Sequence, residues 1–296
     1  MDERSTSGAS DGPTARLAPG LYLVATPIGN ARDITLRALD ALAGADILAA
    51  EDTRTTRRLL EIHGIKRASS SLWPYHEHNG PQQRPRILEA LAAGQSVALA
   101  SDAGTPLISD PGYPLVRAAI AAGLAVYPLP GPSAPLAALA LSGLPTDRFF
   151  FAGFLPPKSA ARAKALMDLA QVPATLIFFE APRRLAACLT SMAETLGGRR
   201  DAAVCREITK RFEEARRGTL AELASAYAAE SDPKGEIVIV IGPPLPQDVS
   251  ETAIDARLRE ALANGSVKDA AQLVAAELGL PRRQVYARAL ALDSEA

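Results

Sequence analysis

The chain has 296 residues, of which 48% are hydrophobic and 22% are charged, and its formal net charge is -1. This length and composition are typical of a globular protein with two domains. The near-neutral charge excludes a global attraction to polyanions, so a nucleic acid would have to bind at local basic patches. No apolar run approaches the ~20 residues of a membrane span, and the polar N-terminus is unlike a signal peptide. We therefore expect a cytoplasmic protein with no membrane partner.

Residues 1–19 are rich in Ser, Gly, Thr and Asp, and we expect them to form a disordered tail. Strand, loop and helix patterns then alternate over residues 20–145, which predicts an α/β domain with a mostly parallel sheet covered by helices. The expected strands are 21–25, 46–50, 69–73, 97–100 and 125–129, and the expected helices are 36–42, 53–62, 86–93, 113–120 and a segment from 134.

A second alternation, over residues 146–243, predicts a second α/β domain. Its expected strands are 148–151, 175–179, 202–205, 213–217 and 237–241, and its expected helices are 183–196 and 220–229. Lys158, Arg162 and Lys164 are expected to precede a further helix. A second basic cluster comprises Arg206, Lys210, Arg211, Arg216 and Arg217. Cys188 and Cys205 match no metal-ligand spacing and are expected to be buried free thiols in a reducing cytosol.

A stiff Gly/Pro linker at 242–246 leads to a helical module over residues 250–293. Its apolar residues at helical spacing are Leu258, Leu262, Val267, Ala271, Val274, Leu278, Val285 and Leu290. Ser266 is a good N-cap and Gly279 a good C-terminal stop. The spacing fits a helix-turn-helix whose second helix carries arginines up to Arg288, or a plain three-helix packing module.

Three loops follow strands of the first predicted sheet, at 26–30, 101–112 and 130–134. Each carries Gly, Pro and a small hydroxyl or amide side chain. Because parallel strands end at the same edge of a sheet, we expect these loops to converge and to offer backbone groups to a small ligand. The alternative for 101–112 is a sharp strand-to-helix turn with Asp110 as a helix cap. The chain lacks the phosphate loop, the dinucleotide-binding glycine motif and the nucleophile elbow.

Six segments, in the same order and with matching spacing, resemble the tetrapyrrole methylase superfamily. More narrowly, they resemble its ribosomal RNA branch, the small-subunit methyltransferase I family. They are 21–30 (LYLVATPIGN) with 33–35 (DIT), 51–54 (EDTR), 75–79 (YHEHN), 101–112 (SDAGTPLISDPG), 131–134 (GPSA) and 179–184 (FEAPRR). The resemblance covers residues 21–292 and includes the C-terminal module.

The resemblance implies a homodimer that transfers a methyl group from S-adenosylmethionine to the ribose 2′-hydroxyl of a decoding-site cytidine in 16S rRNA. It places the donor in a cleft between the two α/β domains, and Thr105 stands where the superfamily often has Asp. The implied donor-binding residues are Asp102, Gly104, Thr105, Pro106, Ile108, Ser133, Ala134, Phe179 and Gly235. The expected substrate-binding residues are Pro27, Gly29, Asn30, Arg54, His76, His78, Asn79, Lys158 and Arg183.

A hydroxyl is a poor nucleophile until it loses its proton, so a general base is expected. The candidates at strand ends and nearby are Glu51, Asp52, Asp102, Glu180, His76 and His78. We prefer Glu51 or Asp102, although Glu51 and Asp52 also suit a helix start and Glu180 a strand end. His76 and His78 would face one side of an extended segment, but no third ligand is evident and no metal is expected.

Two other functions remain open from the sequence. A methyltransferase acting on a tetrapyrrole, such as a corrinoid precursor, would use the same scaffold but would not need the basic clusters or the C-terminal module. A nucleic-acid-binding regulator would use the terminal helices, but it would not need three ligand-type loops.

Overall fold

The computed structural model describes residues 17–245, 251–278 and 280–294. Most of the expected tail and Gly279 lie outside these residues. The chain divides into two compact units, Met1–Pro243 and Pro244–Ala296, and each is described by itself. Among the described residues, none of the helices combines the length and hydropathy needed to cross a membrane.

The first sheet has five strands in the order β3-β2-β4-β1-β5, and every pairing is parallel. Its strands are β1 (Gly20–Val24), β2 (Ile47–Ala50), β3 (Leu72–Pro74), β4 (Ser96–Ala100) and β5 (Val126–Leu129). Strands β2 and β4 are buried along their whole length, as their continuous apolar sequences require in a sheet covered on both faces. The predicted parallel sheet is confirmed.

Four helices cover this sheet: α1 (Leu36–Gly44), α2 (Thr53–Ile62), α3 (Gly80–Ala92) and α4 (Tyr113–Ala121). Helices α1 and α2 pack on one face, and α3 and α4 pack on the other. The Thr35 and Asp52 side chains accept backbone hydrogen bonds at the starts of α1 and α2. Such caps satisfy N–H groups that have no partner within the helix.

Two local predictions in this domain were wrong. Helix α3 begins at Gly80 rather than near residue 86, because Pro81 suits a first turn and the helix continues through Pro85. Residues Ser69–Ser71 form a 3₁₀ turn, so the strand starts only at Leu72. The alternative in which Asp110 caps α4 is also excluded, since the N-cap is Gly112, which has a φ of 127° and no side-chain cap bond.

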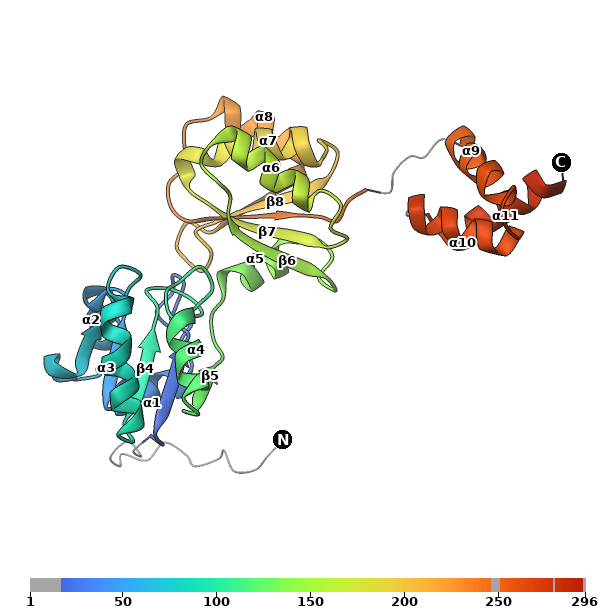
Figure 1. The fold of residues 1–296 in the computed structure, drawn as a ribbon. Coiled ribbons are helices and arrows are strands. Elements are labelled where there is room, and N and C mark those ends of the chain that lie inside the picture. Colours follow the sequence, from blue (N-terminus) through green and yellow to red (C-terminus); the bar gives the residue numbers. More distant parts are fainter. Residues whose placement is uncertain (1–16, 246–250, 279, 295–296) are drawn as a thin grey trace. The chain divides into compact units, whose positions relative to one another are not determined.

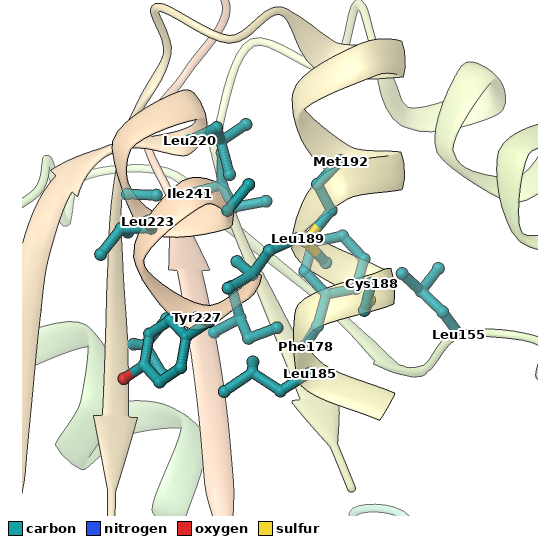
Figure 2. Packing of buried hydrophobic residues seen from close by; sticks show 14 of the residues in the cluster. Leu155, Phe178, Leu185, Cys188, Leu189, Met192, Leu220, Leu223, Tyr227 and Ile241 are labelled. Carbon is teal, nitrogen blue, oxygen red and sulfur yellow. The ribbon is translucent and has the colours of Figure 1, made fainter. Parts of the chain in front are cut away.

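The second sheet also has five strands, in the order β6-β7-β10-β8-β9, but only β6 and β7 are parallel. Its strands are β6 (Phe149–Phe154), β7 (Thr175–Glu180), β8 (Asp201–Arg206), β9 (Glu214–Thr219) and β10 (Ile237–Ile241). Helices α6 (Ser159–Leu169), α7 (Leu185–Leu196) and α8 (Leu220–Ala229) cover one face of this sheet (Figure 1). Figure 2 shows this core, where Phe178, Cys188 and Met192 interdigitate.

Helix α5 (Ala134–Ser142) follows a strand of the first sheet but packs against the free face of the second. Its Ala138 and Leu139 lie with Val240 of β10 in one buried cluster, and Ile28 from the first domain joins them. Helix α5 and Ile28 therefore make apolar contacts between the first domain and the second sheet. Cys188 and Cys205 are both free and buried, as expected.

Much of the expected basic surface is engaged within the protein. Arg162 lies inside α6 rather than before it, is buried, and donates to Ser191 Oγ at 3.0 Å. Arg206 and Arg216 both pair with Glu214, while Lys210 pairs with Glu207 and Glu236. These pairs hold the second sheet and its loops together, so the cluster is not an unpaired patch.

The C-terminal unit contains α9 (Glu251–Leu262), α10 (Val267–Leu278) and α11 (Arg282–Ser294) around one apolar cluster. Ser266 Oγ accepts from the Asp269 N–H at 3.2 Å, in agreement with its predicted capping role. Leu290, one of the apolar residues at helical spacing, is 47% exposed, whereas Ala289 and Leu292 are buried. Arg288 forms a two-pronged pair with Asp255, which removes it from a free phosphate-binding surface.

Candidate active site

The loops that follow the first sheet are joined by short hydrogen bonds. The backbones of Thr26 and Gly104 exchange two bonds of 2.9 Å, and Thr105 Oγ1 donates to the Pro132 carbonyl at 2.9 Å. The Asp102 carboxylate accepts the Asp52 N–H at 2.9 Å, which adds the β2–α2 turn. The predicted convergence of the three loops at one sheet edge is confirmed.

The loop after β4 has an unusual backbone. Gly104 has a φ of 82°, and Leu107 and Ser109 have φ values of 74° and 65° although they carry side chains. A non-glycine residue in this region costs energy, so the surrounding contacts must hold the loop in place. Gly104 and Pro106 are buried, whereas Asp102 and Ile108 reach the surface. At the surface, this part of the loop therefore presents the Asp102 carboxylate and the Ile108 side chain.

The loop after β5 approaches the first strand closely. A Cβ at Gly131 would lie 2.9 Å from the Ala25 Cβ, so only glycine allows this approach. Ser133 and Ala134 at the start of α5 are half-buried, and the Ser133 side chain makes no cap bond.

Phe179 and Gly235 lie at one edge of the second sheet, because β7 and β10 are antiparallel and Phe179 pairs with Val238. Phe179 is half-buried, with its ring centroid 4.9 Å from that of Phe151. Gly235 has a φ of 97°, and a Cβ there would lie 2.3 Å from Glu207 Cδ. Any side chain at this position would therefore displace Glu207.

The β1–α1 loop contacts the second domain directly. The Asn30 N–H donates to Thr209 Oγ1 at 3.0 Å, and a Cβ at Gly29 would lie 2.5 Å from Lys210 Cγ. Pro27 is half-buried beside them. Gly29 and Asn30 thus serve in the contact between the two α/β domains.

A cavity of about 540 Å³ opens beside these loops. It is bordered by the end of β2, the segment from β3 into α3, and the β4–α4 loop. The lining residues are Glu51, Tyr75, His76, Glu77, Gly80, Pro81, Arg84, Ser109, Asp110, Pro111, Gly112, Tyr113 and Pro114. The volume falls within the usual range for small-molecule pockets.

Two carboxyl groups of this cavity, those of Asp110 and Glu51, have raised pKa values. Burial raises the pKa of Asp110 to about 7, and the nearby charge of Glu51 adds to the shift. Burial, followed by the charge of Asp102, also raises the pKa of Glu51. Perturbed carboxyl groups in a cavity are typical of active sites. Asp102 is not among the lining residues.

The other expected substrate residues are spread over this edge. His76 lines the cavity, but residues 77–79 form a turn, so His76 and His78 do not face one side of an extended segment. Asn79 holds that turn by accepting from the His76 N–H at 2.8 Å. Arg54 is exposed and pairs with Asp52, whose pKa this hydrogen bonding lowers to about 2. Among the described residues, no cluster of three or more potential ligands could hold a metal ion.

Three further residues belong to the second α/β domain. Lys158 and Arg183 are exposed and follow the parallel strands β6 and β7, so they lie at the same edge of the sheet. Glu180 is buried, accepts the Ala181 N–H at 2.8 Å and pairs with Arg184 at 3.1 Å. This arrangement matches the strand-end role rather than that of a general base.

Of the lining residues, sequence reasoning assigned only Glu51 and His76 to a site, and it missed the charged side chains of Asp110 and Arg84 among others. Asp110 was considered only as a helix cap, and Arg84 lies in a turn of α3 that the prolines concealed. The available signal was that the SDAGTPLISDPG loop carries a second Asp after the same strand as Asp102.

Comparisons with known proteins match both parts of the chain. Residues 20–224 match the family model described as Tetrapyrrole (Corrin/Porphyrin) Methylases, and residues 248–293 match the RsmI C-terminal HTH domain. The chain is 54% identical to ribosomal RNA small subunit methyltransferase I of Mesorhizobium japonicum over 96% of each chain. The chain belongs to the ribosomal RNA small subunit methyltransferase I family. The predicted resemblance is therefore confirmed.

Other relatives agree over similar lengths. The protein of the same name from Erythrobacter litoralis is 51% identical over 94% of this methyltransferase and 97% of its own chain. The one from Synechocystis is 47% identical over 93% of this methyltransferase and 99% of its own chain. Solved structures share the fold at low identity. Cobalt precorrin-4 methyltransferase superposes with a TM-score of 0.54 at 16% identity, covering 75% of this chain and 94% of its own. Diphthine synthase superposes with a TM-score of 0.58 at 16% sequence identity, and the match covers 75% of this chain and 89% of the synthase.

The methyltransferases of this family use S-adenosylmethionine. The loops of this methyltransferase suit such a ligand, because the positive φ of Gly104 and the close approach at Gly131 keep side chains away from a backbone-lined edge. The exposed Asp102 carboxylate supplies an acceptor for a positively charged or hydroxyl group.

Proposed function

We propose that this methyltransferase methylates the ribose 2′-hydroxyl of a decoding-site cytidine in 16S rRNA. The observation that carries the proposal is the 54% identity, over 96% of the chain, to a ribosomal RNA small subunit methyltransferase. The enzyme would act in the cytoplasm on rRNA or the small ribosomal subunit. It would act as a homodimer, which the exposed Phe149, Phe150 and Phe154 on edge strand β6 favour.

The donor would supply a methyl group that is already activated by its sulfonium charge. The residues proposed to hold it are Asp102, Gly104, Thr105, Pro106, Ile108, Ser133, Ala134, Phe179 and Gly235. The main task of the protein is then orientation, which can contribute about 7–11 kcal/mol to lowering a barrier. Loops tied by the Thr26–Gly104 and Thr105–Pro132 bonds provide the required rigidity.

Of the two preferred bases, Glu51 is the better supported. It lines the cavity, and its raised pKa makes it a stronger proton acceptor than an ordinary carboxylate. The Asp102 carboxylate is exposed and already accepts the Asp52 N–H. We therefore assign proton removal from the ribose hydroxyl to Glu51 and a donor contact to Asp102.

The proposed substrate-binding residues would contact RNA in the cavity and at exposed cations beside it. His76 lines the cavity, while Arg54, Lys158 and Arg183 are exposed cations suited to phosphate contacts. The remaining proposed substrate-binding residues lie in the β1–α1 loop (Pro27, Gly29 and Asn30) and in the turn before α3 (His78 and Asn79). These contacts position the RNA backbone and carry no sequence information by themselves.

Replacing Asp102 with alanine is expected to raise the dissociation constant for S-adenosylmethionine about tenfold or more. The loss of a charge-assisted hydrogen bond accounts for a change of this size. Isothermal titration calorimetry measures it, and Asp40→Ala on the exposed face of α1 is the matched control. Equal affinities of the Asp102 variant and the unmodified protein would remove Asp102 from the donor site.

The proposed function is tested by methyl transfer from labelled S-adenosylmethionine to small ribosomal subunits from cells that lack the modification. Nuclease digestion then locates the label, which we expect on a ribose 2′-oxygen at the decoding site. Label on a nucleobase would contradict the ribose assignment. Transfer to a corrinoid precursor and not to rRNA would instead support the tetrapyrrole alternative, which the family match over residues 20–224 keeps open.

A further inference from the structure

The turn between β8 and β9 carries an exposed aromatic ring beside an exposed cation. Phe212 is 63% exposed, and the Arg211 Cζ lies 5.4 Å from the centroid of its ring. Within the described part of the chain, no ion pair includes Arg211, whereas Arg206, Lys210 and Arg216 of the same basic cluster all pair with glutamates. The turn therefore offers a ring face and an unpaired positive charge together.

The backbone of this turn is tied down on both sides of the ring. The Thr209 N–H donates to Glu213 Oε2 at 2.6 Å, and the Glu213 N–H donates to the Lys210 carbonyl at 3.1 Å. Lys210 Nζ also pairs with Glu207 at 2.8 Å. Glu207 and Thr209 have φ values of 51° and 66°, a backbone conformation that costs energy and persists only where the surroundings hold it. A ligand that covers the Phe212 ring would thus bind with little loss of backbone freedom.

The turn lies at the edge of the second sheet where exposed cations gather. Strands β6, β7 and β8 run in the same direction, since β6 pairs parallel with β7, and both β7 and β8 pair antiparallel with β10. The segments that follow these strands carry the exposed Lys158, Arg183 and Arg211. The Asn30 N–H donates to Thr209 Oγ1, which joins the turn to the β1–α1 loop of the first domain. The ring and three cations therefore share the edge next to the loops of the candidate site.

A ring beside a cation suits an unpaired nucleobase. Proteins bind single-stranded RNA by stacking its bases on aromatic side chains, while arginines contact the adjacent phosphates. Such stacking is tolerant of sequence, because every base has a π-face. A duplex hides the faces of its bases and leaves only its phosphates for contact.

We propose that Phe212 stacks on an unpaired base of the RNA substrate and that Arg211 contacts a phosphate beside this base. The proposal rests on the function proposed above, because it takes RNA as the substrate. It adds a contact to the face of a base, which the phosphate contacts assigned to Lys158 and Arg183 do not provide. A polyanion is favoured over a protein partner, because the cations at this edge would be left uncompensated against an apolar surface.

The test measures binding of the full-length protein to a single-stranded RNA and to a duplex of equal length by fluorescence anisotropy. Phe212→Ala should weaken binding of the single strand about 5- to 150-fold, the range for the loss of one base–aromatic stack, and should change duplex binding little. Phe212→Leu should lose as much, because leucine is apolar but has no aromatic face, whereas Phe212→Trp should retain the affinity. Ile120→Ala is the matched control, since Ile120 is 62% exposed near the end of α4.

The salt dependence of binding separates the two side chains. Arg211→Gln should reduce the slope of log K against log salt concentration by about 0.7 for the single strand, as expected when one phosphate contact is lost. Phe212→Ala should lower the affinity at every salt concentration and leave this slope unchanged. If short RNAs bind too weakly to measure, the KM for small ribosomal subunits replaces the dissociation constant, and it should rise in Phe212→Ala and Phe212→Leu but not in Phe212→Trp.

Normal single-strand binding or a normal KM in Phe212→Ala would overturn the proposal. Normal values in Phe212→Leu would also contradict it, because they would assign the side chain to apolar packing. Loss of dimerisation in Phe212→Ala, measured by sedimentation, would assign the ring to an interface between two copies of the chain instead. Failure of the proposed function has another signature, in which the unmodified enzyme binds the donor but labels no ribose.

Discussion

Replacing Glu51 with glutamine is expected to lower the rate of methyl transfer to small ribosomal subunits by about 10²- to 10⁴-fold. This range is typical for the loss of a general base. Glutamine keeps the size of the side chain but cannot accept the hydroxyl proton. Single-turnover kinetics with labelled donor measure the loss, and donor binding by calorimetry should remain unchanged because Glu51 lies in the cavity rather than in the donor loops.

The pH dependence provides an independent check on Glu51. Burial and the charge of Asp102 raise its pKa, so the ionised form that accepts a proton is present only above that raised value. The rate should therefore rise with pH through a limb that Glu51 shares with Asp110, whose pKa is about 7. In the Glu51→Gln variant this limb should be lost or shifted.

Glu89→Gln, on the exposed side of α3, is the matched control and should behave like the unmodified enzyme. A Glu51→Gln variant with normal kcat and an unchanged pH profile would show that another group removes the proton. Asp110 would then be the next candidate, because it is the other lining carboxyl group with a raised pKa.

Replacing Glu180 with alanine is expected to lower the free energy of unfolding by about 3 kcal/mol. The Glu180 side chain has 0% exposure and pairs with Arg184, whose side chain is only 29% exposed. Removing one partner of a buried ion pair leaves the other charge without compensation. It also removes the acceptor of the Ala181 N–H.

Urea unfolding monitored by circular dichroism measures this change. Glu194→Ala on the exposed side of α7 is the matched control and should shift the midpoint little. At temperatures where the Glu180 variant stays folded, its methyl transfer should be close to normal, because Glu180 does not line the cavity. A stable variant that has lost its activity would instead assign Glu180 to the chemistry.

The sequence alone was sufficient for most of the architecture. Apolar runs such as those of β4 and β10 are buried on both faces, and their composition shows this without any knowledge of their neighbours. Helix α2 was predicted at its observed bounds, because the Asp52 cap and the apolar spacing agree. Local failures occurred where prolines were read as helix boundaries, as at Pro85.

The chemistry-bearing loops were also recognised from sequence, because parallel strands must end at one edge of a sheet. Their residue types predicted a ligand site, and the bonds between Thr26, Gly104 and Thr105 and their partners agree with it. The sequence did not show which of the carboxylates has which role. Glu51, Asp102 and Glu180 all follow strands, yet one lines a cavity, one is exposed and one is buried in an ion pair.

The sequence by itself thus determined the family, the two alternating α/β patterns and the helical module, because these depend on local composition and spacing. Only the tertiary structure decided that α5 packs on the second sheet, that Arg162 is buried and that Asp110 and Arg84 face one cavity. Burial and the desolvation that shifts a pKa depend on atoms brought together from distant segments. No local pattern in the chain carries that information.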